Sequence, residues 1–403
     1  MERPGPLAGL LRLFGSYGLA VVVLLLLLLL TFFGTIQQGE LGLYETQRLY
    51  FDSWFTRVDT GLGVGQWHLI LPLPGGQLLM WILAANLIVG GMVRMRRSWR
   101  TAGILVAHVV IAMMLLAGFV KYYQSDDGHV TLWPRESSAE FESHHRWELV
   151  IETDAGDGEL REWKVRHPDL ADLEPGGERT FTHPELPFDV RLSHWMPNAI
   201  PRRKGPMFEV SVPVVDGIYL DAAKLEPQNE RNLAGAYVTL EAKDGGPSPT
   251  GIVFGFTGSP STTARAPWVT RVDGDLWSVE LRRERYPLPF MLRLDEFRAE
   301  FHPGTSMASN YQSEVTKTED GVGTPVTIRM NEPLRQGDYV VFQSNYGPPN
   351  ARPGERMYSG FSVVRNPSDQ WPLYSLLVIA AGLLFHFGVK LVRYTQSERR
   401  KMA

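Results

Sequence analysis

Residues 21–30 read VVVLLLLLLL, an unbroken apolar run close to the amino terminus. A helix that crosses the ~30 Å hydrocarbon core of a bilayer needs roughly 20 apolar residues, and residues 16–35 supply them. A cleaved signal peptide is the alternative, because Arg3 and Arg12 precede the run. The run is long for a signal peptide, however, and no small-residue cleavage site follows it. We therefore predict a membrane-spanning helix at residues 16–35.

Further apolar blocks at residues 77–93, 101–120 and 371–389 have the length and composition of membrane spans. Trp81 lies near one end of the second block, where an amphipathic ring suits the headgroup level. The sequence thus predicts three spans, then a long polar segment, then a fourth span.

Basic residues beside the spans predict the orientation, because cytoplasmic loops carry an excess of lysine and arginine. The short link at residues 94–100 and the tail at residues 390–403 are rich in them, whereas the loop at residues 36–76 has only Arg48 and Arg57. We therefore place residues 1–15, the link and the tail in the cytoplasm. The loop at residues 36–76 and the large segment at residues 121–370 are then extracytoplasmic.

The segment at residues 121–370 is expected to be an all-β, sandwich-like domain. Short apolar or alternating runs, separated by glycine-, proline- and aspartate-rich breakers, are typical of strands in such domains. The predicted strands are residues 147–153, 162–166, 188–192, 208–214, 237–242, 277–281 and 325–330.

Composition excludes several classes of function. The net charge of −4 and the lack of a basic stripe outside the membrane flanks argue against nucleic-acid binding. The chain contains 0 cysteines, so it has no disulfide, no thiolate metal ligand and no part in thiol–disulfide exchange.

Motifs that resemble catalytic ones are better explained otherwise. Ser306, in the run GTSMAS at residues 304–309, and Asp59 resemble parts of a subtilisin-like triad, but no matching histidine segment accompanies them. His144 and His145 are expected to lie in a solvated surface turn, with a metal site as the alternative. No independent active site is evident, and whether the chain is an enzyme stays open.

Polar residues inside the predicted spans are the candidate site, because ionisable groups are costly in a membrane. His108 and Asn86 each lie eight residues, roughly 12 Å, from an arginine of the link, and His386 lies at about 10 Å depth. In one interpretation the three side chains join helices by hydrogen bonds. In the other, His108 is an axial ligand of haem iron, with His386 as a weaker candidate and Asn86 holding the imidazole tautomer. The haem propionates would then contact the arginines of the link, namely Arg94, Arg96, Arg97 and Arg100.

Several segments resemble the ResB (CcsB) family of cytochrome c biogenesis proteins of the system II pathway. The similar amino-terminal segments are SYGLAV (16–21), GTIQQ (34–38), YFDSWF (50–55), LPGG (73–76) and GILVAH (103–108). The similar carboxy-terminal segments are residues 288–297, YQSEV (311–315), NEPL (331–334), 339–346 and 361–367. Gln37 departs from the family, where a proline is expected, and about residues 136–287 are not distinctive.

The resemblance implies a role. Family members work in the bacterial cytoplasmic membrane with a CcsA-like multispan partner. Together they move haem outward and attach it covalently to apocytochrome c. His108 matches the family's membrane histidine, so the resemblance implies a transient b-type haem there, bound by this chain alone or at the interface with the partner. The chain itself is expected to contact membrane lipid. A membrane assembly scaffold that does not bind haem and a ligand-sensing receptor are the alternatives.

Overall fold

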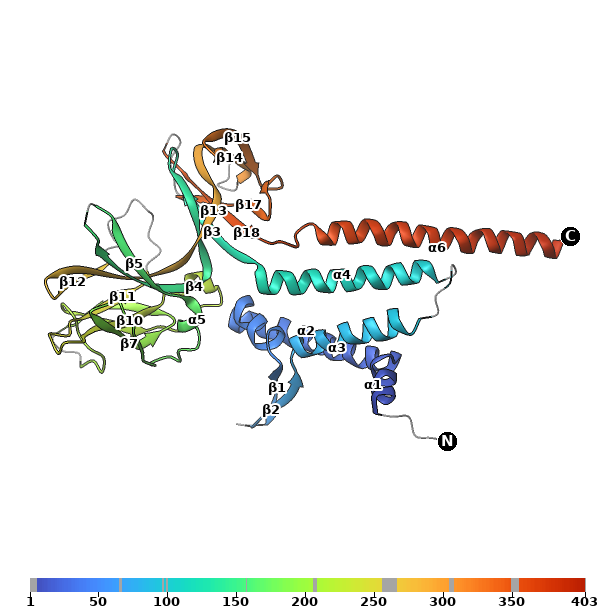
Figure 1. The fold of residues 1–403 in the computed structure, drawn as a ribbon, viewed down its shortest axis with the longest axis horizontal. Helices are drawn as coiled ribbons and strands as arrows, with labels where there is room; N and C mark the ends of the chain where they lie inside the picture. Colours follow the sequence, from blue (N-terminus) through green and yellow to red (C-terminus); the bar gives the residue numbers. More distant parts are fainter. Residues whose placement is uncertain are drawn as a thin grey trace. The chain divides into compact units, whose positions relative to one another are not determined.

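A computed structural model describes residues 6–64, 67–95, 98, 101–156, 158–205, 209–255, 267–303, 308–348 and 355–402. The chain folds as two compact units (Figure 1). One unit combines Met1–Ser125 with Asn366–Ala403 and is helical, and the other, Asp126–Arg365, is built of strands.

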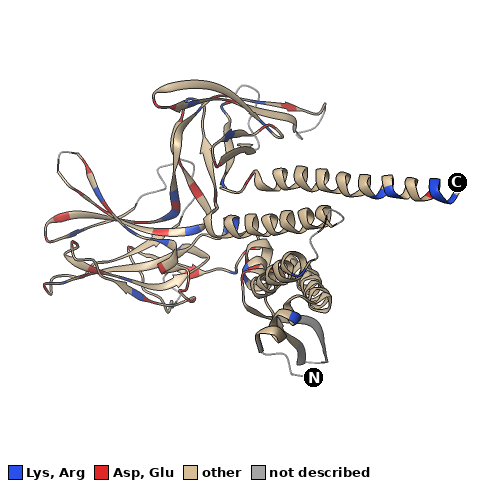
Figure 2. Cartoon of the chain, turned by 45° about the vertical axis from the view of Figure 1, so that its right-hand side comes forward, with Lys and Arg blue, Asp and Glu red and all other residues tan. Residues whose placement is uncertain are grey.

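The helical unit contains the four expected apolar helices, three before the β unit and one after it. They are α2 (Tyr17–Thr46) with its continuation η1 (Gln47–Phe51), α3 (Gly76–Asn86) with η2 (Leu87–Val93), α4 (Ala102–Gln124) and α6 (Trp371–Met402). Each is long and apolar enough to cross a membrane. Figure 2 shows charge gathered at the free end of α6, where Arg399, Arg400 and Lys401 lie.

The first long helix extends beyond its predicted end at residue 35. The helix continues through Gly34 and Gly39 to Gly42, whose φ of 80° marks a kink, and the chain then continues through the π-helix η1. Within residues 36–76, the hairpin of β1 (Phe55–Val64) and β2 (Trp67–Pro74) follows. The short helix α1 (Pro6–Phe14) precedes α2, and the Ser16 side chain caps the start of α2.

The β unit confirms the expected all-β domain. Its larger sheet has the order β15-β14-β13-β4-β3-β18-β17-β16, with β5 and β12 paired to β4 and β13, and a second sheet has the order β11-β10-β7-β6. The strands are β3 (Asp126–Leu132), β4 (Ser137–Asp154), β5 (Leu160–Val165), β6 (Arg179–Phe181), β7 (Phe188–Met196), β8 (Ala199–Arg203), β9 (Ile218–Ala222), β10 (Gly235–Ala242), β11 (Thr250–Phe254), β12 (Trp268–Val272), β13 (Asp275–Phe301), β14 (Ala308–Glu319), β15 (Val322–Arg329), β16 (Leu334–Gln336), β17 (Tyr339–Gly347) and β18 (Tyr358–Arg365).

Two hydrophobic clusters form the interior of this unit. In the first, Leu149 and Val279 of the large sheet pack against Val190 and Val238 of the smaller one, as in a β-sandwich. The second cluster fills the other part of the large sheet. The long strand β13 takes part in both, with Leu281 in the first cluster and Leu292 in the second.

Most predicted strands are confirmed within longer strands, but the strand predicted at residues 208–214 is wrong. Phe208 lies outside the described residues, and residues 209–214 follow an irregular path. Val212 packs into a small cluster around Tyr237 without joining a sheet. Pro213, which has no N–H to donate, interrupts the segment. The apolar alternation there therefore reflects burial against the smaller sheet and not strand pairing.

A buried charge cluster joins β13 to β4 and β5. Arg282 is only 7% exposed and lies 2.9 Å from Glu148, which is 2% exposed. The same guanidinium lies 2.6 Å from Glu162, 3.6 Å from Glu280 and 3.9 Å from Glu152. One cation thus holds four carboxylates in place.

Candidate functional site

The imidazole of His108 has a defined tautomer. Its Nδ1 atom lies 2.7 Å from the carbonyl oxygen of Ile104, one turn earlier in α4. Because a carbonyl oxygen only accepts, Nδ1 carries a proton and donates it, and in the neutral ring Nε2 is then the atom with the lone pair. The side chain is therefore set to act as a ligand or acceptor through Nε2.

The His108 ring lies directly against Gly91 in the π-helical segment η2. A Cβ atom at Gly91 would stand 2.1 Å from Cδ2 and 3.0 Å from Nε2 of His108, which is closer than real contacts allow. Only glycine permits this approach. π-Helical turns are rare and concentrate at functional sites. Sequence reasoning missed this contact, although the Gly90-Gly91 pair in an apolar helix was a visible signal.

The hydrogen bonds of Asn86 go to backbone carbonyls and not to His108, the partner predicted for it. Its buried Nδ2 atom donates to the carbonyl oxygens of Phe14, at 2.6 Å, and Ser16, at 3.0 Å. The side chain thus ties α3 to the corner between α1 and α2, where carbonyls at the end of α1 need donors. The carbonyl of Ile104 holds the His108 tautomer, so the geometry gives Asn86 an architectural role.

The arginines of the link are only partly described. Arg94 Nη1 lies 3.4 Å from the carbonyl oxygen of Gly15 and so contacts the same corner as Asn86. Arg96, Arg97 and Arg100 lie outside the described residues. The predicted contacts between these arginines and the haem propionates are therefore untested and remain a prediction.

His386, which belongs to α6, packs against a face of α4 other than the face that bears His108. The backbone of Gly103 is packed so closely by His386 that a Cβ atom there would stand 2.6 Å from the Cβ of His386. His108 follows Gly103 by five residues, which turns it about 140° around the helix axis. The structure therefore does not bring the two histidines together, and His386 serves the contact between α4 and α6.

An apolar groove lies along the part of α4 that follows His108, and His108 itself is not among its lining residues. It has a volume of about 630 Å³ and lies between α3, η2 and α4. Its walls include Met92 and Val109, the chain neighbours of Gly91 and His108, and Trp81 stacks on Phe119 at 4.4 Å along it. Ligand pockets have volumes of about 300–1,000 Å³, so the groove can take a flat, apolar molecule.

The histidine pair of the β unit is not in a surface turn, so that prediction is wrong. Both residues lie within β4, where His144 stacks on His129 at 5.2 Å and His145 Nδ1 lies 3.0 Å from Asn229 Nδ2. A bulge in the pairing of β4 with β13 hides the strand pattern there. Among the described residues no cluster of histidine, aspartate and glutamate suits a metal ion. Ser306 falls outside the described residues, and only the backbone of Asp59 is described, in β1.

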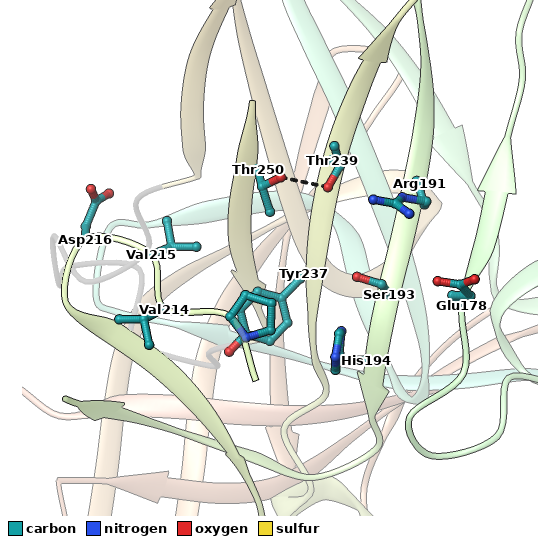
Figure 3. A pocket seen from close by; sticks show the side chains of 11 residues that line it. Glu178, Arg191, Ser193, His194, Val214, Val215, Asp216, Tyr237, Thr239 and Thr250 are labelled. Carbon is teal, nitrogen blue, oxygen red and sulfur yellow. Dashed lines mark hydrogen bonds between the residues drawn. The ribbon is translucent and has the colours of Figure 1, made fainter. Parts of the chain in front are cut away.

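A second pocket lies on the outer face of the smaller sheet (Figure 3). It has a volume of about 560 Å³ and is lined by β7, β10, β11 and residues 213–216. Hydroxyl groups and one guanidinium group cover its floor. Sequence reasoning did not identify this pocket, because its residues come from segments far apart in the chain.

These features describe a protein with four helices suited to a membrane, a large β domain and an apolar groove whose lining residue Val109 adjoins His108. Comparison with protein families agrees with that class, since the model of the ResB-like family matches residues 92–353. The chain belongs to the ResB-like family, which confirms the resemblance of its sequence segments. No curated protein matches the chain.

Proposed function

We propose that this chain handles haem in a membrane as a subunit of a system II cytochrome c haem-attachment complex. It would work with a CcsA-like partner and present haem for covalent attachment to apocytochrome c. The observation that carries the proposal is His108, whose Nδ1 atom is held by the Ile104 carbonyl and whose chain neighbour Val109 lines an apolar groove. Membership of the ResB-like family supports the same role.

The residues of the groove fit haem. A neutral imidazole with Nδ1 hydrogen-bonded to a backbone carbonyl is the usual form of a histidine that ligates iron. The ring of haem is flat and apolar, and the groove is lined almost entirely by aliphatic, aromatic and methionine side chains. Haem supplies the vinyl groups for attachment, and this chain would supply the ligand and the apolar walls.

The four apolar helices support a place in the membrane. Most of their apolar side chains face outward in the isolated chain, as lipid or a partner helix requires. The arginine-rich link and the basic end of α6 favour the cytoplasmic side. The β domain would then face outward across the bacterial cytoplasmic membrane, on the side where haem is attached.

The absence of cysteine is consistent with this chemistry. Attachment adds a thiol S–H of the apocytochrome across a vinyl C=C of haem, and the reactants bring every atom of the new thioether. The protein must then hold the two reactants together in the correct orientation. A chain with 0 cysteines cannot form competing disulfides with the apocytochrome thiols.

Co-expression with a CcsA-like partner and a reporter apocytochrome c tests the proposal. We expect the two membrane proteins to co-purify with haem, as seen by absorption spectroscopy. Covalent haem on the reporter, detected by haem staining, should require this chain. Equal haem content and equal staining when this chain is omitted would refute the proposal.

The contact between Gly91 and His108 gives a first prediction. Gly91→Ala should push the imidazole away and lower bound haem per purified protein by about tenfold or more, as for groups that orient a metal ligand. The control is Gly118→Ala in α4, where a Cβ atom meets nothing within 4 Å. Absorption spectra of both variants in the partner complex measure the effect. Equal haem content in the two variants would contradict the role of Gly91.

The packing of His386 gives a second prediction. His386→Ala removes a side chain that fills the contact with Gly103, so the midpoint of thermal unfolding should fall. Haem per folded protein should stay at the wild-type level, because His386 packs against a face of α4 other than the face that bears His108. A loss of haem without a loss of stability would instead show that His386 is a ligand.

A further inference from the structure

A β-bulge shapes the pocket in the β domain. Met196 pairs with Gly235 and Ser193 pairs with Tyr237, so two residues of β7 face the single residue between them in β10. As a result, Trp195 enters the core, whereas the adjacent residues Ser193 and His194 both line the pocket. Bulges commonly redirect a side chain next to a functional site. Figure 3 shows both side chains on the same side of the sheet.

His194 has two energetically unfavourable features at this position. Its φ of 52° lies in the left-handed region, which non-glycine residues rarely adopt. Its Nδ1 atom is buried and has no hydrogen-bond partner among the described residues, while the ring packs edge-on against Tyr237 at 5.5 Å. Both features cost folding free energy, and the Nδ1 atom can still make one hydrogen bond to a molecule in the pocket.

The floor of the pocket can both donate and accept hydrogen bonds. The hydroxyls of Thr239 and Thr250 lie 2.8 Å apart, and Ser193 adds a third hydroxyl (Figure 3). Arg191 Nε lies 2.9 Å from Glu241, which anchors the guanidinium while its end points toward Thr239. A hydroxyl group serves as donor or acceptor as its partner requires.

The wall opposite the floor is apolar and firmly held. Val214 and Val215 form it, next to a tight turn in which Val215 and Ile218 exchange two backbone hydrogen bonds of 2.9 Å. Asp216 and Gly217 occupy the turn with φ values of 50° and 76°, as such turns require. Asp216 and Glu178 then mark opposite edges of the pocket with carboxylates (Figure 3).

We propose that this pocket binds a short extended segment of polypeptide, and that the segment belongs to the apocytochrome c that is being matured. A peptide main chain alternates C=O acceptors and N–H donors, which match hydroxyls, an imidazole and a guanidinium on the floor. The carboxylates at the edges take N–H groups or basic side chains, and the valine wall takes an apolar one. That the peptide comes from apocytochrome c rests on the proposed function. That the ligand is an extended peptide rests on the residues of the pocket.

Fluorescence anisotropy with the full-length protein in lipid nanodiscs tests this site. The probe is a labelled synthetic peptide that contains the Cys-x-x-Cys-His segment of a c-type cytochrome, with serine in place of both cysteines. We expect His194→Gly and Thr239→Val each to raise the Kd of the peptide by about tenfold or more, as loss of one or two buried hydrogen bonds implies. Thr318→Val in β14, outside the pocket, should leave Kd unchanged.

His194→Gly separates binding from folding, because glycine suits the left-handed backbone at this position. This variant should be as stable as the wild type or more so, yet bind the peptide weakly. Wild-type affinity in His194→Gly, no peptide binding by the wild type, or equal binding of free acetate and peptide would overturn the proposal. Haem content of the same preparations reports on the proposed function separately. Loss of haem binding with intact peptide binding would refute only the haem role. Intact haem binding without peptide binding would refute only the peptide site.

Discussion

His108→Ala is expected to remove haem from the purified partner complex and to abolish covalent haem on a reporter cytochrome. Loss of groups that merely orient a metal ligand costs about 10–100-fold in affinity, so loss of the ligand itself should exceed about 100-fold. The effect is so large because Ile104 holds the ring in one tautomer and Gly91 holds it in one place. No nearby described side chain can replace it, since His386 faces elsewhere.

Added imidazole provides the control for this result. His108→Gly leaves a space next to Gly91 that free imidazole can enter, so haem content should recover in its presence. His386→Gly should show no response to imidazole. If the His108→Ala complex carries the same pigment as the wild type, with the same spectrum, haem binding through His108 is refuted and only the architecture remains.

Arg282→Met is expected to cause the largest loss of stability in the β domain, about 3–5 kcal/mol at neutral pH. The substitution leaves Glu148 buried with no cation beside it, and Glu152, Glu162 and Glu280 still point at the same space. Denaturant unfolding of the full-length protein, followed by circular dichroism, measures the change. The control is Arg298→Met, because its pair with Glu296 is 57% and 54% exposed and such solvent-screened pairs contribute little to stability. Equal effects in the two variants would contradict this account of the buried cluster.

The pH dependence of that variant should be opposite in sign to the wild type. In the wild type, burial opposes ionisation of Glu162, but hydrogen bonds from Lys164 and Arg282 outweigh it and lower its pKa. Its contribution to stability is therefore present above the unfolded pKa of about 4.3 and is lost as pH falls through the lower folded pKa. Without the guanidinium we expect the crowded carboxylates to have raised pKa values in the folded state. The variant should then gain stability as pH falls from 7 toward 5, whereas the wild type should not.

The sequence predicted the architecture well because burial and membrane spans follow from simple patterns. The run at residues 21–30 and the other apolar blocks needed no tertiary information, and strands such as residues 237–242 follow from alternation between Gly and Asp breakers. The pattern failed at residues 208–214, because apolar side chains can be buried by a loop as well as by a strand. It also failed at His144, where a bulge breaks the alternation.

The candidate site was predicted only in part. An ionisable residue in an apolar helix identified His108 without any structure. Its surroundings depend on which helices meet and at which rotation. Depth along the helix placed Asn86 and His386 in the same layer, but depth does not fix the face on which a side chain lies. The π-helix η2, which brings Gly91 to the imidazole, depends on tertiary packing that no local propensity encodes.

The single strand β13 has a consequence for how the β domain unfolds. Because one continuous backbone contributes side chains to both hydrophobic clusters, neither cluster can come apart without disturbing the other. The two should therefore lose structure in one cooperative transition, with amide hydrogens in the middle of β13 exchanging most slowly with solvent. A domain that unfolds in one transition keeps the parts of its large sheet in a fixed arrangement up to that transition.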